Sequence, residues 1–389
     1  MAERSPGDPA NSPDAEPVRR ITSLLRQHAD PSGWLRFDRF MDLALYTEGA
    51  GFYTRPDVRL GRAGAFYTAA HTTPLFGATL AKRAAEEFRA LGRPANFQVV
   101  EVGAGDGTLF TDFMAAARRD PDLGEARWTY RLVERSPALT GRLRERTAST
   151  DRPTGVSVEP ASTVSEVGPF QGLLFGNELL DAFPVRRFTR VGGELVELGV
   201  QVGAPRLDWA SRPVTDAPAG VPPVPALGED EVFEVTPRAE AFLREIADLL
   251  LEGTAIFLDY GDSESELRHR FPRGSLSAIR GHRVVDDALE HLGETDLSAN
   301  VNFTRMRSAA ARAGLHEIAY ESQSSALGRW GFAEARDEWL RTAKDPETSV
   351  RRALGAKNLL FGFSSFRVLE LGAGAGGATR PKTSGPRDG

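Results

Sequence analysis

The stretch Val99–Leu109, with the sequence VVEVGAGDGTL, decides the fold that we predict for this chain of 389 residues. It begins inside the apolar run Phe97–Val102, which is typical of a buried strand, and it leads into a predicted helix at Leu109–Arg118. Three glycines stand between strand and helix, at Gly103, Gly105 and Gly107. Glycine accepts a positive φ and leaves room for a ligand against the main chain. The stretch therefore predicts a strand, a ligand-binding turn and a helix.

The segments after this turn alternate between strand and helix patterns. Strands are predicted at 128–134, 156–159, 172–176 and 255–260, and helices at 136–147 and 236–251. This alternation of strands and helices is typical of a parallel sheet covered by helices on both faces. We therefore predict an α/β fold of the Rossmann-like kind. Ligands of such sheets bind beyond the carboxyl ends of the strands, close to the point where the strand order reverses.

The remaining segments suggest how the chain is organised. Residues 1–17 and 371–389 are rich in Pro, Gly, Ser and Asp, and we expect two disordered tails. Residues 18–95 are predicted to form a mainly helical region with helices at 18–28, 37–46 and 79–91, and Asp38 is a candidate cap of the second. The α/β domain is predicted at 96–370. It contains a hairpin at 185–202 and a Pro-rich exposed insertion at 203–230.

Composition narrows the classes of protein. With 48 Lys and Arg against 54 Asp and Glu, the net charge is −6, which argues against a large nucleic-acid footprint. The absence of cysteine excludes disulfides, thiolate zinc sites and cysteine nucleophiles. No apolar run approaches the roughly 20 residues of a membrane helix, and the first residues lack the apolar core of a secretory signal. We expect a cytoplasmic protein without nucleic-acid or membrane partners, and a homodimer remains open.

The charges of the glycine turn indicate the kind of ligand. Glu101 and Asp106 lie in or beside it and would repel a pyrophosphate. The spacing G-x-G-x-G also differs from the dinucleotide fingerprint G-x-G-x-x-G, and the next strand-end acid, Glu134, stands 31 residues after Gly103 rather than about 20. S-adenosylmethionine (SAM), which is cationic and lacks phosphate, suits these acids better. We predict SAM as the cofactor, with Glu134 accepting both ribose hydroxyls. A nicotinamide cofactor and a tight turn without ligand are the alternatives.

A third signal is the segment Phe175–Val185, FGNELLDAFPV. An apolar strand ends in Asn177 and Glu178, and Asp181 follows three residues later. On a helical turn Glu178 and Asp181 lie on one side, where they could bind a cationic methyl acceptor or take a proton from it. The competing interpretation is capping of a helix start by Asn177 and Asp181.

In these motifs the chain resembles the MidA family of class I SAM-dependent methyltransferases. This is the family of a mitochondrial complex I assembly factor that methylates an arginine of a complex I subunit. The resemblance extends from about residue 49 to residue 331, and NELLDAFPV is specific to this family. It rests on Gly61–Ala81 (GRAGAFYTAAHTTPLFGATLA), Val99–Met114 (VVEVGAGDGTLFTDFM), Tyr130–Leu139 (YRLVERSPAL) with Asn177–Val185, Phe257–Gly261 (FLDYG) and, more loosely, Arg280–Thr304.

The resemblance implies roles for individual residues. The residues expected to bind SAM are Glu101, Gly103, Gly105, Asp106, Gly107, Glu134 and Asn177, with Gly64, Phe66, Tyr67 and Thr68 closing over the cofactor. The predicted catalytic residues are Glu178, Asp181 and His282. The predicted substrate-binding residues are His71, Asp259 and Tyr260.

Some positions depart from the family pattern. The family usually has an acid at the position of Ala65, and it has S-P-E-I-S where this chain has Ala69–Thr73, which includes His71. Its later D-[IL]-T-A-H-V-D-F pattern contains Asn300 and Asn302 here. Because acidic or imidazole groups are replaced at these positions, the methyl acceptor of this chain could differ from that of the family. The glycine turn that is predicted to bind SAM is unchanged.

The predicted reaction is direct displacement of the methyl group of SAM by a nitrogen of an arginine side chain in a protein or peptide. Carboxylates would hold the guanidinium, and no metal is predicted. One alternative is an O- or N-methyltransferase of a small molecule. The other is a protein of the same fold that binds SAM without catalysis and serves as an assembly partner.

Overall fold

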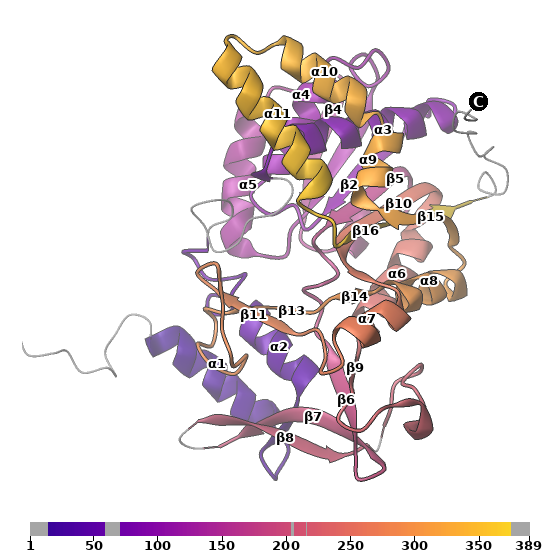
Figure 1. Cartoon of the computed structure of the whole chain (residues 1–389). Coiled ribbons are helices and arrows are strands. Elements are labelled where there is room, and N and C mark those ends of the chain that lie inside the picture. The colour runs from indigo at the N-terminus through magenta and orange to yellow at the C-terminus, as the bar shows by residue number, and fades with distance from the viewer. Residues whose placement is uncertain (1–14, 59–70, 204–205, 215, 375–389) are drawn as a thin grey trace, which may run out of the picture.

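The computed structural model describes residues 15–58, 71–203, 206–214 and 216–374, and Figure 1 shows how they are arranged. The chain forms two lobes, an upper lobe around a large sheet and a lower lobe around smaller antiparallel sheets. The predicted tails lie mostly outside the described residues. The predicted cofactor-covering residues Gly64, Phe66, Tyr67 and Thr68 lie outside them entirely.

The upper lobe contains the predicted parallel sheet. Its strand order is β15-β16-β10-β5-β2-β3-β4, with β14 beside the end of β10. Five of these strands, β10, β5, β2, β3 and β4, run parallel to one another. The strand β16 is antiparallel to both of its neighbours, β10 and β15. The strands are β2 Phe97–Val102, β3 Trp128–Val133, β4 Val156–Ala161, β5 Phe170–Asn177, β10 Leu250–Asp262, β14 Val301–Asn302, β15 His316–Ser322 and β16 Phe366–Ala373. The α/β prediction is thus confirmed.

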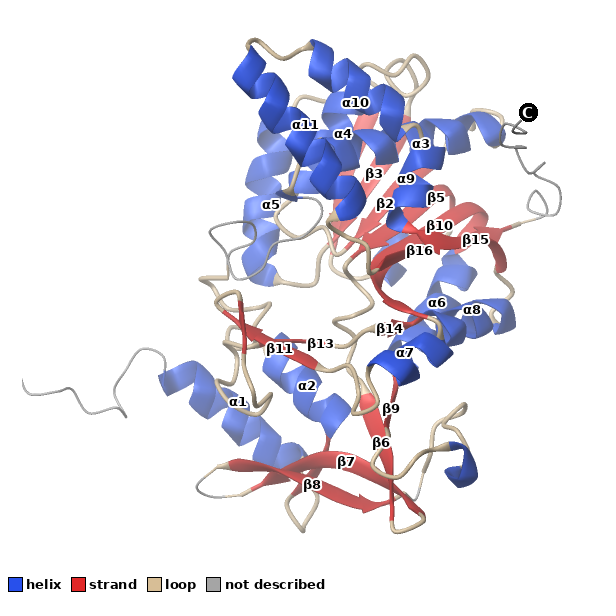
Figure 2. Ribbon diagram, viewed as in Figure 1, coloured by secondary structure: helices blue, strands red, loops and turns tan. Residues whose placement is uncertain are grey.

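Helices cover both faces of this sheet (Figure 2). Successive side chains of a strand point to opposite faces, so Val99 packs into one hydrophobic core and Val100 into the other. The first face carries α3 Leu75–Ala90, α4 Thr108–Ala117, α5 Pro137–Ser149, α9 Gln323–Arg329, α10 Phe332–Arg341 and α11 Pro346–Phe361. The second face carries η3 Val164–Val167, α6 Pro237–Leu249 and α8 Phe303–Arg312, and the short helix α7 Glu264–Arg270 contacts α8.

The lower lobe is assembled from segments that are far apart in the sequence. Its core joins Ile21, Phe40, Val200 and Leu297, each from a different element. The helices are α1 Ala15–His28 and α2 Phe37–Tyr46, and the five-stranded sheet consists of β1 Trp34–Arg36, β6 Arg186–Val191, β7 Glu194–Val202, β8 Leu207–Pro213 and β9 Val232–Val235. The three-stranded sheet consists of β11 Ser277–Arg280, β12 Arg283–Val284 and β13 Asp296–Ser298.

This lobe changes the predicted boundaries. The expected helical region 18–95 is divided, because α3 packs on the large sheet whereas α1 and α2 pack in the lower lobe. The expected insertion 203–230 contributes β8, which pairs with β7 and stacks Trp209 on Phe37 with ring centroids 5.1 Å apart. Asp38 lies within α2 rather than at its cap, which is Arg36. Local sequence could not show these pairings, since they depend on strands from other segments.

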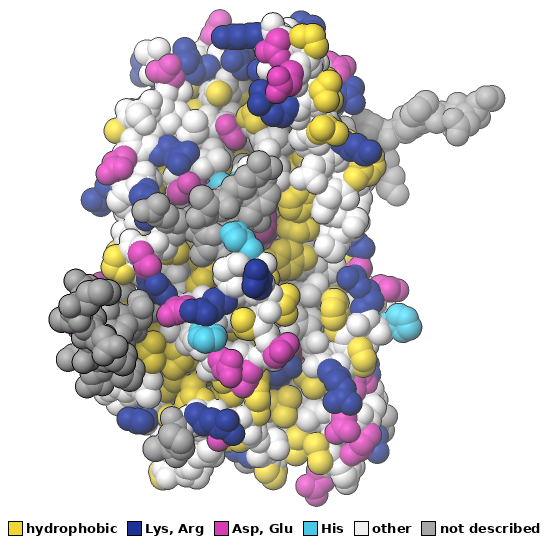
Figure 3. Space-filling model, turned by 60° about the vertical axis from the view of Figure 1, so that its left-hand side comes forward, with side chains coloured by type: hydrophobic (Ala, Val, Ile, Leu, Met, Phe, Trp, Pro, Cys, Tyr) yellow, Lys and Arg dark blue, Asp and Glu magenta, His cyan; other side chains and the backbone are white. Residues whose placement is uncertain are grey.

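The surface mixes charges of both signs. Figure 3 shows one face, on which Lys and Arg side chains are interspersed with Asp and Glu side chains. Within the described residues, no helix combines the length and apolar character that crossing a membrane requires.

Candidate active site

A cavity of about 580 Å³ lies at the carboxyl ends of β2, β3 and β5, where the strand order reverses. One end is lined by the glycine turn at 103–106 and by Glu134, and Tyr46 and Tyr53 of the lower lobe also line the cavity. Parts of η3 and α6 complete its wall. The volume is within the usual range of small-molecule sites. The cavity therefore has the position that the sequence predicted for a bound ligand.

The glycine turn has the backbone geometry that the sequence predicted. Gly103, Gly105 and Gly107 have φ values of +76°, +58° and +78°. A Cβ atom on Gly107 would lie 2.8 Å from a methyl group of Leu143, so this position has no room for a side chain. Gly103 and Gly105 line the cavity, whereas Gly107 turns the chain into α4. The backbone of the turn is thus open to a ligand.

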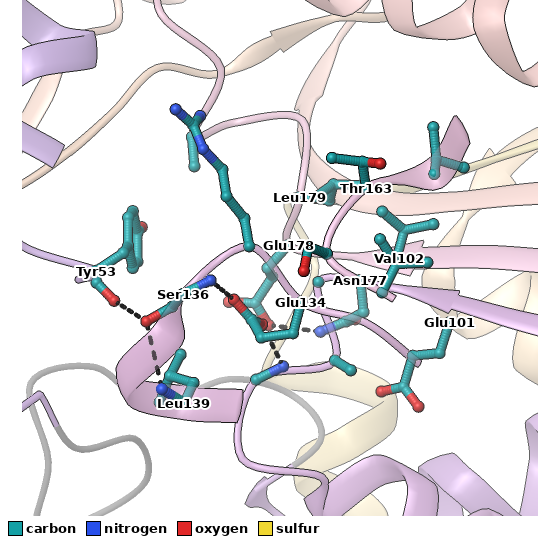
Figure 4. A pocket seen from close by; sticks show the side chains of 18 of the residues that line it. Tyr53, Glu101, Val102, Glu134, Ser136, Leu139, Thr163, Asn177, Glu178 and Leu179 are labelled. Carbon is teal, nitrogen blue, oxygen red and sulfur yellow. Dashed lines mark hydrogen bonds between the residues drawn. The ribbon is translucent and has the colours of Figure 1, made fainter. Parts of the chain in front are cut away.

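Glu134 joins the glycine turn to the start of α5 (Figure 4). Its Oε2 accepts a hydrogen bond from the N–H of Gly105 at 2.8 Å, and its Oε1 accepts one from the N–H of Ser136 at 2.7 Å. Burial raises the pKa of Glu134 to about 7, although these two donors oppose the rise. Each carboxylate oxygen keeps a second lone pair. Glu134 can therefore hold the turn and also accept hydroxyl groups of a ligand.

Two further acids flank the turn. Glu101 is 3% exposed and accepts a hydrogen bond of 2.6 Å from the Tyr130 hydroxyl, and burial raises its pKa to about 8. Burial also acts on Asp106, but the neighbouring His71 ring, hydrogen bonds from Thr108 and the nearby Arg146 guanidinium hold the pKa of Asp106 below its usual range. Arg146 donates to Asp106 at 3.1 Å, and the His71 ring nitrogen lies 3.8 Å from it. The structure therefore places His71 beside the glycine turn.

The turn after β5 is strained and firmly held. Glu178 has a φ of +49°, which costs a side chain of this kind about 1–3 kcal/mol. Asp259, on β10, accepts hydrogen bonds at its Oδ2 from the backbone N–H groups of Leu179, Leu180 and Asp181, at 3.0, 2.7 and 3.2 Å. These bonds fix the turn. Because Asp259 is 1% exposed and does not line the cavity, its place is behind the turn rather than against a substrate.

Behind Glu178, carboxylates and tyrosines gather from both lobes. Asp181 accepts a hydrogen bond from the Tyr260 hydroxyl, and burial raises the pKa of Asp181 to about 6. Asp296, on β13, accepts a hydrogen bond of 2.8 Å from the Tyr53 hydroxyl, and burial raises its pKa to about 7. We call Glu178, Asp181, Asp296, Tyr46 and Tyr53 the acidic end of the site. Asp181 and Tyr260 lie behind the cavity wall.

Three buried carboxylates of this region, Asp181, Asp259 and Asp296, lie close to other carboxylates. No described Lys, Arg or His forms an ion pair with Asp181, Asp259 or Asp296, and the charged groups that act on Asp259 and Asp296 are other carboxylates. Buried carboxylates are costly unless a cation or hydrogen-bond donors compensate them. Among the described residues, no group of His, Asp and Glu side chains is placed to hold a metal ion. The acidic end therefore suits an organic cation.

Other predicted residues lie elsewhere. His282 occupies the exposed two-residue turn between β11 and β12, with a φ of +63°, and it does not line the cavity. Its hairpin position accounts for this, since such turns place both central residues at positive φ. Asn302 caps α8 by accepting the N–H of Arg305 at 3.2 Å. Asn300 and Asn302 both line a separate depression of about 30 Å³.

Tyr46 and Tyr53 also line the cavity, although the sequence pattern did not predict them as site residues. The Tyr46 hydroxyl donates to the carbonyl of Ala182 at 2.9 Å, and the two tyrosine rings stack with centroids 5.6 Å apart. The aromatic-rich segment GAGFYT at 49–54 was the only signal of this wall.

The strand order with an antiparallel β16, the acidic glycine turn and the carboxylate at the end of β3 define a class I SAM-dependent methyltransferase. The residues fit the cofactor, because the turn exposes its backbone and Glu134 reaches the cavity.

Comparisons with known proteins agree with this class. A family model of S-adenosyl-L-methionine-dependent methyltransferases matches residues 79–320, more than half of the chain, and the chain belongs to this family, the MidA-like methyltransferases. It is 26% identical over 351 residues to the mitochondrial protein arginine methyltransferase NDUFAF7 of Danio rerio, covering 83% of this chain and 78% of that protein. It is 27% identical over 354 residues to the Drosophila melanogaster homolog, covering 84% and 78%.

A solved structure is similar over almost the whole chain. It is a protein from Burkholderia thailandensis bound to S-adenosyl-homocysteine, with a TM-score of 0.80, 28% identity and 96% of both chains covered. A second crystal structure from the same organism, without a named ligand, gives a TM-score of 0.78 and 29% identity. The predictions of a methyltransferase, of its fold and of SAM as cofactor are confirmed.

Proposed function

We propose that this enzyme transfers the methyl group of SAM to an arginine side chain of a protein or peptide. One observation carries the proposal, namely that the buried carboxylates of Asp181 and Asp296 have no neutralising cation among the described residues. A guanidinium is planar, always charged and able to bind two carboxylates at once. Bound beside Glu178 in the cavity, it would bring a positive charge close to these carboxylates.

The chain's own residues mainly bind and orient the reactants. When bound, SAM supplies an activated methyl group on a sulfonium, which needs no further activation by the protein. Glu178 lines the cavity at the end of β5, and the strained turn held by Asp259 fixes its backbone. Holding a nitrogen in line with the methyl group is the largest contribution that such a site can make. We assign Glu178 to the acceptor guanidinium, with Asp181 adding negative charge from behind.

The relatives support an arginine acceptor, since those in Danio rerio and Drosophila melanogaster are named protein arginine methyltransferases. The departures at Asn300 and Asn302 do not argue for a different acceptor, because both residues lie at the separate depression. A small-molecule acceptor is therefore the less favoured alternative. Cytoplasmic location and a homodimeric state stay predictions.

The test uses tritiated SAM and a protein extract from cells in which the gene has been deleted. We expect label in protein, and after acid hydrolysis of that protein we expect the label to migrate with methylarginine. The Asp181→Asn variant should bind S-adenosyl-homocysteine like the wild type and transfer less label. Glu159→Gln is the matched control, because Glu159 is a half-buried acid of β4 that pairs with Arg131 and does not line the cavity. Label confined to small molecules or to another amino acid would contradict the arginine assignment.

A further inference from the structure

Tyr53 is held in the cavity wall from three directions. Its hydroxyl donates to Asp296 at 2.8 Å, and its carbonyl accepts a hydrogen bond of 2.6 Å from the Ser136 hydroxyl. Its ring stacks on Tyr46 with a centroid distance of 5.6 Å. Figure 4 shows Tyr53 beside Ser136, which follows the cofactor-binding Glu134 by two residues. A side chain fixed in this way presents its hydroxyl at one position.

The reaction requires a group that takes a proton. A guanidinium has a pKa above about 12 and does not release a proton to water at neutral pH. Its nitrogen forms a bond to carbon as the carbon–sulfur bond breaks and the electron pair of that bond goes to sulfur. One N–H proton must then leave, because the methylated product carries the same single positive charge as the acceptor.

We propose that Tyr53 and Asp296 form the proton-accepting pair of this reaction, an inference that rests on the proposed function. The acceptor N–H passes its proton to the Tyr53 oxygen as the Tyr53 hydroxyl passes its own proton to Asp296. Tyr53 ends unchanged, and the Asp296 carboxylate becomes a carboxylic acid. The charges balance, since one carboxylate and one sulfonium are neutralised together.

The direction of the hydrogen bond supports this role. Because the Tyr53 hydroxyl donates its proton to Asp296, the Tyr53 oxygen would meet an acceptor N–H group as a hydrogen-bond acceptor. Glu178 also lines the cavity, where we assign it to bind the acceptor guanidinium, whereas the buried acids behind the turn are placed differently. Asp259 is occupied by three backbone donors, and Asp181 is bonded by Tyr260 behind the wall. Among these, Tyr53 with Asp296 combines access to the cavity with a carboxylate ready to receive a proton.

The electrostatics of the pair agree with the geometry. Burial raises the pKa of Asp296 to about 7, and the neighbouring Asp181 adds to the rise while Tyr53 opposes it. Burial also raises the pKa of Tyr53 well above its ordinary value, with Asp296, Tyr46 and Asp181 contributing. Arg135 is a nearby cation, which lies over the Tyr46 ring at 4.5 Å and acts on Tyr46. Tyr53 thus stays protonated and conducts the proton that Asp296 stores near neutral pH.

The first test does not require the natural acceptor. Methylguanidinium chloride is titrated calorimetrically into the protein saturated with S-adenosyl-homocysteine at pH 7, in phosphate and in Tris. These buffers differ in ionisation heat, so the comparison counts protons released. Since Asp296 with a pKa of about 7 is half protonated, we expect release of roughly 0.5 proton as the cation binds. Asp296→Asn should bind methylguanidinium with little proton release.

The second test uses the methyl acceptor labelled from the extract. Tyr53→Phe should lower kcat at least about 100-fold, in the range of general acid–base contributions, with KM for SAM within about 3-fold. The wild-type kcat should rise with pH around 7, and Asp296→Asn should lose this rise. Tyr320→Phe, on β15, is the control and should behave like the wild type.

Two results overturn the pair. If proton release persists in Asp296→Asn, Asp296 is not the group that takes up the proton. If the kcat of Tyr53→Phe is within about 3-fold of the wild type, Tyr53 does not transfer the proton. In either case wild-type formation of methylarginine leaves the proposed function standing. If the wild type neither binds methylguanidinium nor forms methylarginine, the proposed function fails and the pair fails with it. Unaltered binding of S-adenosyl-homocysteine shows that a variant is folded.

Discussion

The two ends of the cavity are built in different ways. At the cofactor end, the carboxylates are engaged locally, with Glu134 bonded to the N–H groups of Gly105 and Ser136 and Asp106 bonded to Arg146. At the acidic end, Tyr53 and Asp296 are 243 residues apart in the sequence and come from separate parts of the lower lobe. There the carboxylates face one another. Among the described residues, Asp181 and Asp296 have no ion-pair partner, and they belong to the end that we assign to the acceptor.

The difference has a physical consequence for mutations. A change at the cofactor end should lower cofactor affinity, because its hydrogen bonds shape the turn that binds SAM. A change that neutralises an acid at the acidic end should cost activity while relieving the folded state of a buried charge. Four predictions test this contrast, and they begin with the largest expected effect.

Gly105→Arg should weaken binding of S-adenosyl-homocysteine at least roughly 100-fold, or about 2.7 kcal/mol. Gly105 has a φ of +58° and lines the cavity, so arginine would strain the turn and fill the site. Calorimetric titration measures the affinity. Gly141→Arg in α5 is the control, because nothing lies within 4 Å of a Cβ atom placed there. Equal affinity of the two variants would show that the glycine turn does not bind the cofactor.

Asp259→Ala should lower the free energy of unfolding by about 2 kcal/mol, because three backbone N–H groups lose their acceptor. Urea denaturation measures this change. Asp337→Ala in α10 is the control and should stay within about 0.5 kcal/mol of the wild type, since Asp337 is exposed. Wild-type stability of Asp259→Ala would show that the turn after β5 does not depend on this carboxylate.

The same contrast explains how much the sequence could predict. The glycine turn and Glu134 were predictable, since a strand, its turn and the next strand end lie close together in the sequence and follow one pattern. Tyr53 was not predictable, because it meets Asp296 only when α2 and β13 pack in the lower lobe. His282 shows the opposite case. Its motif matched the family, but the tight turn that contains it places it outside the cavity wall.

Glu134→Gln should weaken binding of S-adenosyl-homocysteine about 10-fold, a loss of about 1.4 kcal/mol. The amide has one oxygen where the carboxylate has two, so its NH₂ group must face the N–H of Gly105 or of Ser136. Glu159→Gln is the matched control. Methylguanidinium binding should be unchanged in Glu134→Gln, which separates the two ends of the site. A parallel loss of both ligands would indicate that the whole cavity has collapsed.

Asp296→Asn should raise the melting temperature at pH 8 by about 1 °C, the effect of roughly 1 kcal/mol in a chain of this size. The pKa of Asp296 rises from 3.8 in the unfolded chain to about 7 in the folded protein, so the folded state binds the extra proton. Stability from this group is therefore complete below pH 4 and is lost as the pH rises towards 7. Asparagine keeps an oxygen for the Tyr53 hydroxyl and removes the charge.

The gain in Asp296→Asn should consequently shrink at pH 5, where the wild-type carboxylate is largely protonated. Scanning calorimetry at both pH values measures it, with Asp208→Asn, an exposed acid of β8, as control. A lower melting temperature of Asp296→Asn at pH 8 would show that the carboxylate is stabilised in the folded protein, and the contrast between the two ends would disappear. A higher one, together with lost methyl transfer, would mean that the acidic end gives up stability for its reaction.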